Sequence, residues 1–247
     1  MNKPSKAPAT HHPSSAFGTP NPHSVWPHEP DAASPAVPER YFGVWSRSLL
    51  ETPQVRDTTT FVRWMQLGRW HVDLRVPANG SGPCQGFCGI TRISQINGRD
   101  VCTWQRMVDY TPPRDTVDEG WVDFESSERL IETGIHGVYH EVWDRLHGSV
   151  GQGLALAEKR QDNLPQARLF VSGNCLMRVR PCAPLGPAFE ISFGRWERGV
   201  WRIEQSTIAT LRGQSIKLNI NRTDTNLARV TIDGNSRDWA VLEASGD

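Results

Sequence analysis

From residue 40 onward, short stretches of apolar and polar residues alternate and are separated by turn residues, which is the pattern of β-strands. No segment of ten or more residues carries a convincing helical pattern. Many short strands joined by regular turns predict an all-β protein, built as a sandwich or an antiparallel barrel. The expected strands cover residues 41–50, 61–66, 69–76, 86–95, 101–108, 136–146, 153–159, 167–172, 175–180, 189–196, 200–205, 215–220, 228–232 and 239–242.

Turn residues between these strands predict hairpins. Asn97-Gly98 is the strongest signal, because both residues tolerate the positive φ angles of a two-residue hairpin turn. Arg198-Gly199 and Asp233-Gly234 separate two further strand pairs. Strand density is similar on both sides of residues 148–153, which predicts a boundary there between two β lobes.

The hairpin over residues 61–76 has two faces of different character. An even-length loop around Leu67-Gly68 fixes which side chains share a face. The ordinary antiparallel sheet turns its polar face to water, which favours solvent exposure of the mixed face; the alternative is that the mixed face lines a cavity. The apolar face carries Phe61, Met65, Trp70, Val72, Leu74 and Val76, and the mixed face carries Val62, Trp64, Gln66, His71, Asp73 and Arg75.

The stretch from Ile135 to Trp143 has no fully apolar face in either parity. A strand that is polar on both sides yet rich in aromatic residues fits a barrel around a wet or ligand-filled interior. Trp104 and Arg106 also lie on the same face of an expected strand. The guanidinium group therefore either stacks on the indole ring, or the aliphatic part of the arginine side chain covers it.

Residues 1–38 differ from the rest of the chain. They hold nine of the 18 prolines and four of the eight histidines, with Ser, Ala and Thr filling most of the remainder. Such a segment buries too little apolar surface to offset the entropy of ordering it. We therefore expect a disordered tail over 1–38, in which Trp26 is the one candidate anchor, and a β-barrel body over 39–247.

Charge and composition exclude several classes of protein. Lys and Arg total 27, as do Asp and Glu, and this balance argues against nucleic-acid binding. No run of 18 apolar residues exists, and no apolar signal segment follows the N-terminus, so we expect neither membrane insertion nor secretion. The five cysteines have irregular spacing, which predicts reduced thiols in a cytoplasmic protein without a metal or other cofactor.

Three short motifs carry a resemblance to a known family. They are Glu132-Thr133-Gly134, Glu141-Val142-Trp143 and Gly194-Arg195-Trp196. In these motifs and in strand order over residues 120–205, the chain resembles the yeast Hri family of lipocalin-like β-barrel proteins. The resemblance implies a calycin-type barrel and no established catalytic residue. It also makes Gly43-Val44-Trp45 the nearest counterpart of the lipocalin Gly-x-Trp motif, in which the tryptophan closes the barrel floor by packing.

Two functional hypotheses follow from the mixed faces. The first is a cofactor-independent enzyme (a lyase, isomerase, hydratase or hydrolase) that transfers protons on a small aromatic or unsaturated molecule in a barrel cavity. Arg75, Arg106 and Arg145 suggest that this substrate is anionic, since arginine pairs with carboxylates. In this scheme Glu141 or His71 is the base and Tyr139 the donor. The expected substrate-binding residues are Arg75, Arg106, Trp64, Trp104, Trp143, Asp73 and Gln66.

The second hypothesis is a non-catalytic, lipocalin-like protein that binds a small molecule. A third alternative is an interaction protein whose barrel is filled by side chains and whose proline-rich tail recruits partners. A cavity of roughly 300 Å³ or more favours the first two, whereas a filled barrel favours the third. Either small-molecule function is compatible with a homodimer.

Overall fold

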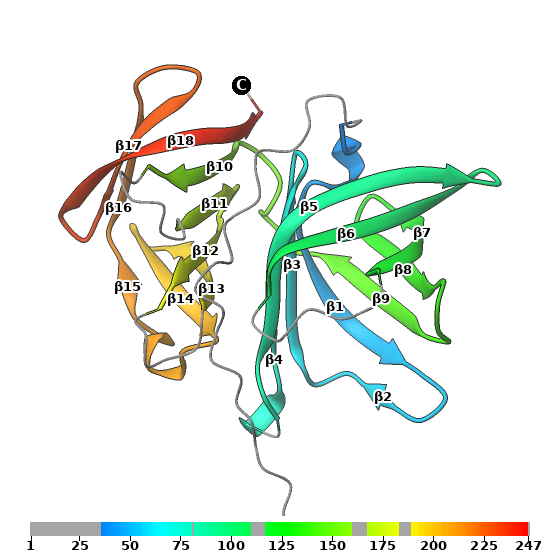
Figure 1. The fold of residues 1–247 in the computed structure, drawn as a ribbon. Helices are drawn as coiled ribbons and strands as arrows, with labels where there is room; N and C mark the ends of the chain where they lie inside the picture. The colour runs from blue at the N-terminus through cyan, green and yellow to red at the C-terminus, as the bar shows by residue number, and fades with distance from the viewer. Residues whose placement is uncertain (1–35, 81, 110–116, 160–166, 183–188, 247) are drawn as a thin grey trace, which may run out of the picture.

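The computed structural model describes residues 36–80, 82–109, 117–159, 167–182 and 189–246. Its described residues form eighteen β-strands in two nine-stranded antiparallel sheets (Figure 1). The predicted all-β antiparallel class is therefore confirmed. Residues 1–35 of the expected tail, including Trp26, lie outside the described residues. None of the helices in the described part of the chain has the length and apolar character needed to cross a membrane.

The first sheet closes into a barrel of eight strands, because its first long strand pairs with its last. A ninth, two-residue strand extends the first strand at one edge. The strands are β1 (Gly43–Glu51), β2 (Arg56–Asp57), β3 (Phe61–Leu67), β4 (Trp70–Val76), β5 (Gln85–Ile96), β6 (Arg99–Asp109), β7 (Glu119–Ser126), β8 (Arg129–Gly134) and β9 (His140–Arg145).

The second sheet forms a nearly closed barrel in the order β15-β14-β13-β12-β11-β10-β18-β17-β16. The chain passes from the first sheet to the second between Arg145 and Gly153. The strands are β10 (Gly153–Glu158), β11 (Arg168–Ser172), β12 (Cys175–Pro181), β13 (Phe189–Glu197), β14 (Val200–Ser206), β15 (Ser215–Ile216), β16 (Leu218–Arg222), β17 (Leu227–Ile232) and β18 (Asn235–Ser245).

The three predicted hairpin turns are present. Asn97, Arg198 and Asp233 have φ angles of 52°, 49° and 50°, and each precedes a glycine of positive φ. Asn97-Gly98 therefore joins β5 to β6 through the tight turn that its residue types favour. The β3–β4 hairpin closes one position later than expected, around Gly68-Arg69.

Barrel closure decides which face of the β3–β4 hairpin meets water. Trp64 pairs with Asp73 and Met65 with Val72, so the predicted parity is confirmed. The mixed face points into the barrel: Trp64, His71 and Asp73 are each at most 2% exposed. The favoured interpretation, that this face is solvated, is wrong, because closure of the sheet leaves its inner face without access to bulk water.

Two expected strands begin later than the sequence pattern indicated. Residues 39–41 form a short 3-10 turn, so β1 starts at Gly43. The strand expected over 136–146 is only His140–Arg145, because the residues after Gly134 bend back and the Gly134 N–H donates to the carbonyl of Tyr139 at 3.2 Å. Tyr139 therefore lies in the β8–β9 connection and not on the strand that carries Glu141 and Trp143.

The apolar face of the β3–β4 hairpin packs against the second barrel. Met65, Val72 and Leu74 from the first barrel share one buried cluster with Met177 and Phe193 from the second. The Phe61 and Phe193 rings lie 6.0 Å apart across this contact. The two lobes therefore share one core, and each barrel also has an apolar cluster of its own.

We expect Phe193→Ala to lower the free energy of unfolding by about 3 to 5 kcal/mol, because it removes a fully buried ring from the shared core. Urea unfolding followed by tryptophan fluorescence measures the change. The control is Val138→Ala, at an 80% exposed position, which should stay within about 0.5 kcal/mol of wild type. Equal stabilities of the two variants would contradict a shared core.

Candidate functional site

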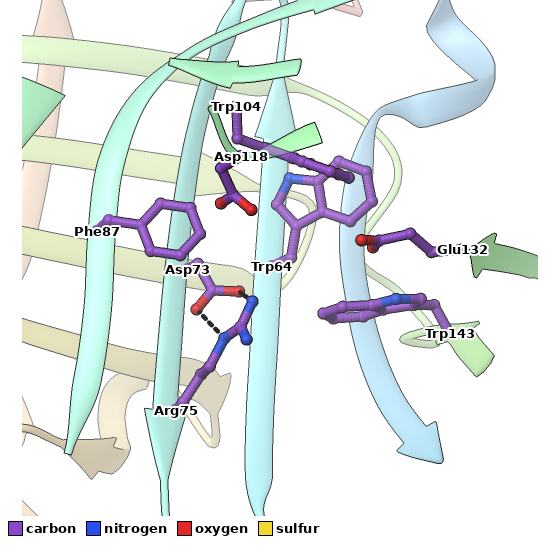
Figure 2. A pocket seen from close by; sticks show the side chains of 8 residues that line it. All are labelled: Trp64, Asp73, Arg75, Phe87, Trp104, Asp118, Glu132 and Trp143. Atoms are coloured by element: carbon purple, nitrogen blue, oxygen red, sulfur yellow. Dashed lines mark hydrogen bonds and ion pairs between the residues drawn. The ribbon is translucent and has the colours of Figure 1, made fainter. Parts of the chain in front are cut away.

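The closed barrel contains a partly open hollow, lined by side chains from six of its strands and from Asp118, the residue just before β7 (Figure 2). The lining combines aromatic rings with ionisable groups. Its residues are Trp64, Asp73, Arg75, Phe87, Trp104, Asp118, Glu132 and Trp143.

Three tryptophans form the aromatic wall. The Trp64 ring meets Trp104 edge-on at 5.5 Å and Trp143 edge-on at 5.8 Å. Trp45 stacks behind Trp64 at 6.4 Å, and its indole N–H donates to the carbonyl of Tyr41 at 2.8 Å. Trp45 is fully buried and has the packing role that the lipocalin resemblance implied. The indole N–H of Trp143 is buried without a hydrogen-bond partner among the described residues.

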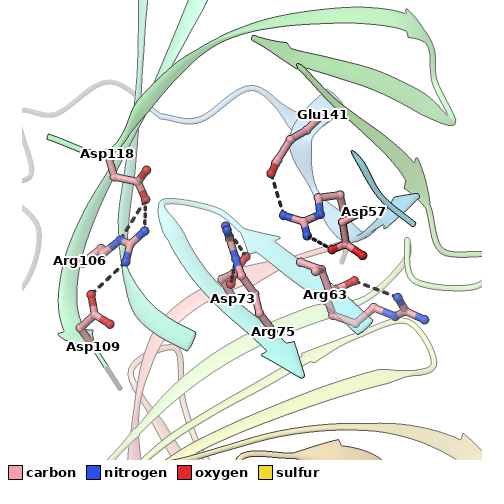
Figure 3. Close-up of polar contacts among 10 residues, drawn as sticks. Asp57, Arg63, Asp73, Arg75, Arg106, Asp109, Asp118 and Glu141 are labelled. Atoms are coloured by element: carbon pink, nitrogen blue, oxygen red, sulfur yellow. Dashed lines mark hydrogen bonds and ion pairs between the residues drawn. The ribbon is translucent and has the colours of Figure 1, made fainter. Parts of the chain in front are cut away.

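The arginines near the hollow are already paired with carboxylates (Figure 3). Arg75 donates to Asp73 through its Nε at 2.8 Å. Arg106 donates to Asp118 at 2.6 and 2.9 Å and to Asp109 at 3.0 Å, and it lies 3.7 Å from the centre of the Phe87 ring. Both guanidinium groups are thus held in place by the protein's own carboxylates.

A second ion-pair group lies beside the hollow. Arg47 donates to Glu141 at 2.8 Å and to Asp57 at 3.0 Å. Glu141 faces Glu132 directly across the β8–β9 pair. Because Arg47 already holds Glu141, its carboxylate is tied to a cation and is not placed as an unpaired base.

Glu132 is the most unusual ionisable group of the hollow. It is 7% exposed, and the Tyr139 hydroxyl donates to its Oε1 at 2.7 Å. Burial, followed by the charge of Glu141, raises the pKa of Glu132 well above its usual range, against the effect of the Tyr139 hydrogen bond. The structure therefore favours the protonated, uncharged form of Glu132 to a higher pH than an exposed glutamate.

Carboxyl groups outnumber guanidinium groups here. The described lining residues include three carboxyl groups, those of Asp73, Asp118 and Glu132, and one guanidinium group, that of Arg75. The neighbouring groups do not reverse this balance, since Arg106 is matched by Asp109 and Arg47 by two carboxylates. With Glu132 uncharged, the hollow and its surroundings still carry a surplus of negative charge.

His71 and Gln66 do not line the hollow but lie directly behind it: the Trp64 indole N–H donates to Gln66 at 3.3 Å, and the His71 ring lies 5.5 Å from that of Phe87. The Thr91 hydroxyl donates to Gln66 at 2.7 Å and lies 3.0 Å from His71 Nδ1. Burial, followed by the charge of Arg106, lowers the pKa of His71 to about 3. His71 is therefore neutral at physiological pH, and the Phe87 ring stands between it and the hollow.

The predicted site residues thus fall into three groups. Trp64, Asp73, Arg75, Trp104 and Trp143 line the hollow, as expected. Arg106, Glu141 and Tyr139 stand behind it, each bonded to a lining residue or facing one. His71 and Gln66 form the third group, a buried hydrogen-bond pair with Thr91 that contacts the lining through Phe87 and Trp64. Arg145, the third arginine from which an anionic substrate was inferred, stacks 4.2 Å over Trp45 and donates to the carbonyl of Arg40 at 2.7 Å.

Sequence reasoning missed Phe87, Asp118 and Glu132. Glu132 shares a parity with the buried Leu130 on β8, so alternation along that strand carried a usable signal. Phe87 lies on an expected strand, opposite Asp73. Asp118 precedes β7 in a connecting segment, where no periodicity indicates direction.

The hollow is small. The space open to the centres of water molecules is about 20 Å³, which is room for one or two waters. This is far below the roughly 300 Å³ of a typical ligand pocket. Side chains therefore fill most of this barrel, which by the volume criterion favours the interaction-protein alternative over binding of a whole drug-sized molecule. The hollow has room only for a small head group.

Comparisons with known proteins identify the fold and no function. No protein-family model and no curated protein matches the chain. The fold is similar to the crystal structure of an uncharacterized protein, YLR301w, from Saccharomyces cerevisiae, with a TM-score of 0.64 and 14% sequence identity. The match covers 83% of this chain and 99% of the yeast chain. The resemblance to a yeast β-barrel family is thus supported at the level of fold.

We expect Glu132→Gln to flatten the pH dependence of stability. The folded protein keeps a proton on Glu132 that the unfolded chain releases above its ordinary pKa, so wild type loses stability as pH rises. As pH rises above about 5, where the unfolded chain has released this proton, the stability of the variant relative to wild type should increase by up to about 1.4 kcal/mol per pH unit. Urea unfolding across this range measures the difference.

The matched control is Glu128→Gln, whose side chain is 65% exposed and should leave the pH profile of wild type unchanged. Parallel stability curves for wild type and Glu132→Gln would show that Glu132 is already ionised in the folded protein.

Proposed function

We propose that the closed barrel binds the positively charged head group of a small organic amine. The observation that carries this proposal is the surplus of carboxyl groups around an aromatic hollow. Carboxylates attract a cation directly, and the faces of indole rings attract it through their quadrupoles. The neutral Glu132 carboxyl supplies a further oxygen that can accept a hydrogen bond.

The same contacts disfavour the anionic ligand expected from the sequence. An incoming carboxylate would have to displace Asp73 from Arg75, or Asp118 and Asp109 from Arg106. Each displacement would leave a carboxylate of the protein without its partner in a partly buried place, which is costly.

The dimensions of the hollow restrict the ligand further. About 20 Å³ accommodates a group the size of a water molecule, such as an ammonium. The side chains of Arg75 and Asp118 are 23% and 26% exposed, so the hollow reaches solvent on their side. The remainder of the ligand would extend outward there, past the aromatic wall.

A protonated Glu132 gives this binding site a pH response. A cation in the hollow stabilises the ionised carboxylate and opposes the effect of burial on its pKa. Binding is therefore coupled to release of the Glu132 proton. By the same linkage, affinity for the cation rises as pH increases, as long as the ligand amine stays protonated.

We further infer that this barrel is lipocalin-like. The support comes from Gly43 and Trp45 at the start of β1, where the buried indole packs against the inner core under Arg145. This arrangement agrees with the structural role that the resemblance gave to Trp45.

We expect benzylamine to bind wild type, and Asp118→Asn to weaken that binding about tenfold, because a charge-assisted contact is lost at the mouth of the hollow. Isothermal titration calorimetry in buffers of different ionisation enthalpy reports the affinity and the protons released. Wild type should release protons on binding, whereas Glu132→Gln should bind without release.

The control variant is Asp123→Asn, which changes a 48% exposed carboxylate on the outside of the same barrel. Its affinity for benzylamine should equal that of wild type. An affinity for benzylamine that is unchanged in Asp118→Asn would refute the cation site.

A second candidate is the proton-transfer enzyme predicted from the sequence. The observation in its favour is the hydrogen-bonded pair of Tyr139 and a protonated Glu132, which places an acid at the wall of the hollow. If a substrate is turned over, Glu132→Gln should lower kcat about 10²- to 10⁴-fold while ligand binding persists. Full activity in that variant would rule out Glu132 as the catalytic acid, and only the proposed binding function would remain.

A further inference from the structure

The second barrel has a cleft of its own at one end, of opposite character to the hollow. The space open to water centres there is about 310 Å³, within the range of ligand pockets. Strands β10, β12, β17 and β18 of the second barrel contribute to it. Its lining residues are Glu158, Ala167, Arg178, Arg180, Pro181, Val230, Ile232, Asn235, Arg237 and Trp239.

A fully buried carboxylate positions two of the arginines. Glu190 is 0% exposed and accepts from Arg178 Nε at 3.0 Å and Arg178 Nη2 at 2.6 Å. Arg180 donates to the other oxygen of the same carboxylate. The Ser192 hydroxyl donates to Glu190 at 2.6 Å and also contacts Ser206 at 2.8 Å. Both guanidinium groups therefore have their positions set before any ligand arrives.

This end of the barrel carries a surplus of positive charge. One carboxylate, Glu190, serves both Arg178 and Arg180, and Glu158 pairs with Arg237 at 2.7 Å. Among the described residues that line or support the cleft, three guanidinium groups thus face two carboxylates. The surplus of one positive charge matches a ligand with a single negative charge.

An ion-pair network here has no evident structural purpose. The interior of the same barrel is otherwise apolar, with Leu156 and Leu176 on the strands that carry Glu158 and Arg178. Replacing buried ion pairs by apolar residues is often neutral or stabilising, so stability alone does not account for them. The cleft also has an apolar wall beside these charged groups, formed by Trp239, Val230 and Ile232.

We propose that this cleft binds a small organic monocarboxylate. Its carboxylate would accept hydrogen bonds from Arg178, Arg180 and Arg237, because arginine presents its donors in a fork that fits a carboxylate. Its apolar portion would lie against the wall formed by Trp239, Val230 and Ile232. The proposal is independent of the function proposed for the closed barrel, because the two sites share no residue.

The test uses benzoate as the probe and the full-length protein. Isothermal titration calorimetry should show benzoate binding to wild type, with the uncharged benzamide at least about tenfold weaker. Arg180→Gln should weaken benzoate binding about tenfold, since it removes a guanidinium whose side chain is 46% exposed and so can be replaced without opening the core. Inorganic phosphate, which lacks an apolar part, should bind more weakly than benzoate.

The matched control is Arg202→Gln, which removes a 49% exposed arginine of the same lobe outside the cleft and should leave the affinity unchanged. The comparison of benzoate with benzamide on wild type needs no variant, so it holds even if Arg180→Gln folds poorly. Equal affinities for these two compounds, no heat of binding with benzoate up to about 10 mM, phosphate binding as tightly as benzoate, or a loss equal in Arg180→Gln and Arg202→Gln would overturn the proposal.

Discussion

The pairing of β1 with β9 is the constraint on which the closed barrel depends. It joins the two ends of one sheet, so every strand acquires an inner face that is largely shielded from bulk water. Asp73, Arg75 and Glu132 lie on that inner face, and the hollow reaches solvent at its Arg75 end. An unpaired charge is unfavourable in a medium of low polarity. Asp73 and Arg75 avoid this by forming an ion pair, whereas for Glu132 burial favours the protonated, uncharged form.

In the second barrel, the buried ionisable groups are distributed differently. Its centre is apolar, and its ionisable groups gather at one end, where Glu190 holds Arg178 and Arg180 beside open space. The shared core between the lobes has no part in either site, because it is built from the outer face of β3 and β4 and the facing strands of the second sheet. One chain thus carries an acidic aromatic hollow and a basic cleft on a common apolar frame.

Much of this architecture could be predicted from residue patterns. The parity of the β3–β4 hairpin follows from an even loop, and the turn at Asn97-Gly98 follows from residues that tolerate positive φ. Parity assigns side chains to a common face without saying which face points inward. That choice depends on a strand pairing between residues about 100 positions apart, for which Trp64 and Asp73 carry no local signal. Glu132 could have been found, because it alternates with the buried Leu130 on β8, whereas Asp118 lies before a strand, where no periodicity indicates the direction of its side chain.

The protonation state of Glu132 tests the account most directly. Carbon-13 NMR of protein labelled at the glutamate carboxyl carbons, with Glu132→Gln to assign the signal, follows each carboxyl as pH is raised. We predict that the Glu132 carboxyl stays protonated to a clearly higher pH than an ordinary glutamate, whose usual pKa is about 4.3. A Glu132 signal that titrates together with the exposed glutamates would contradict a closed, low-polarity barrel interior.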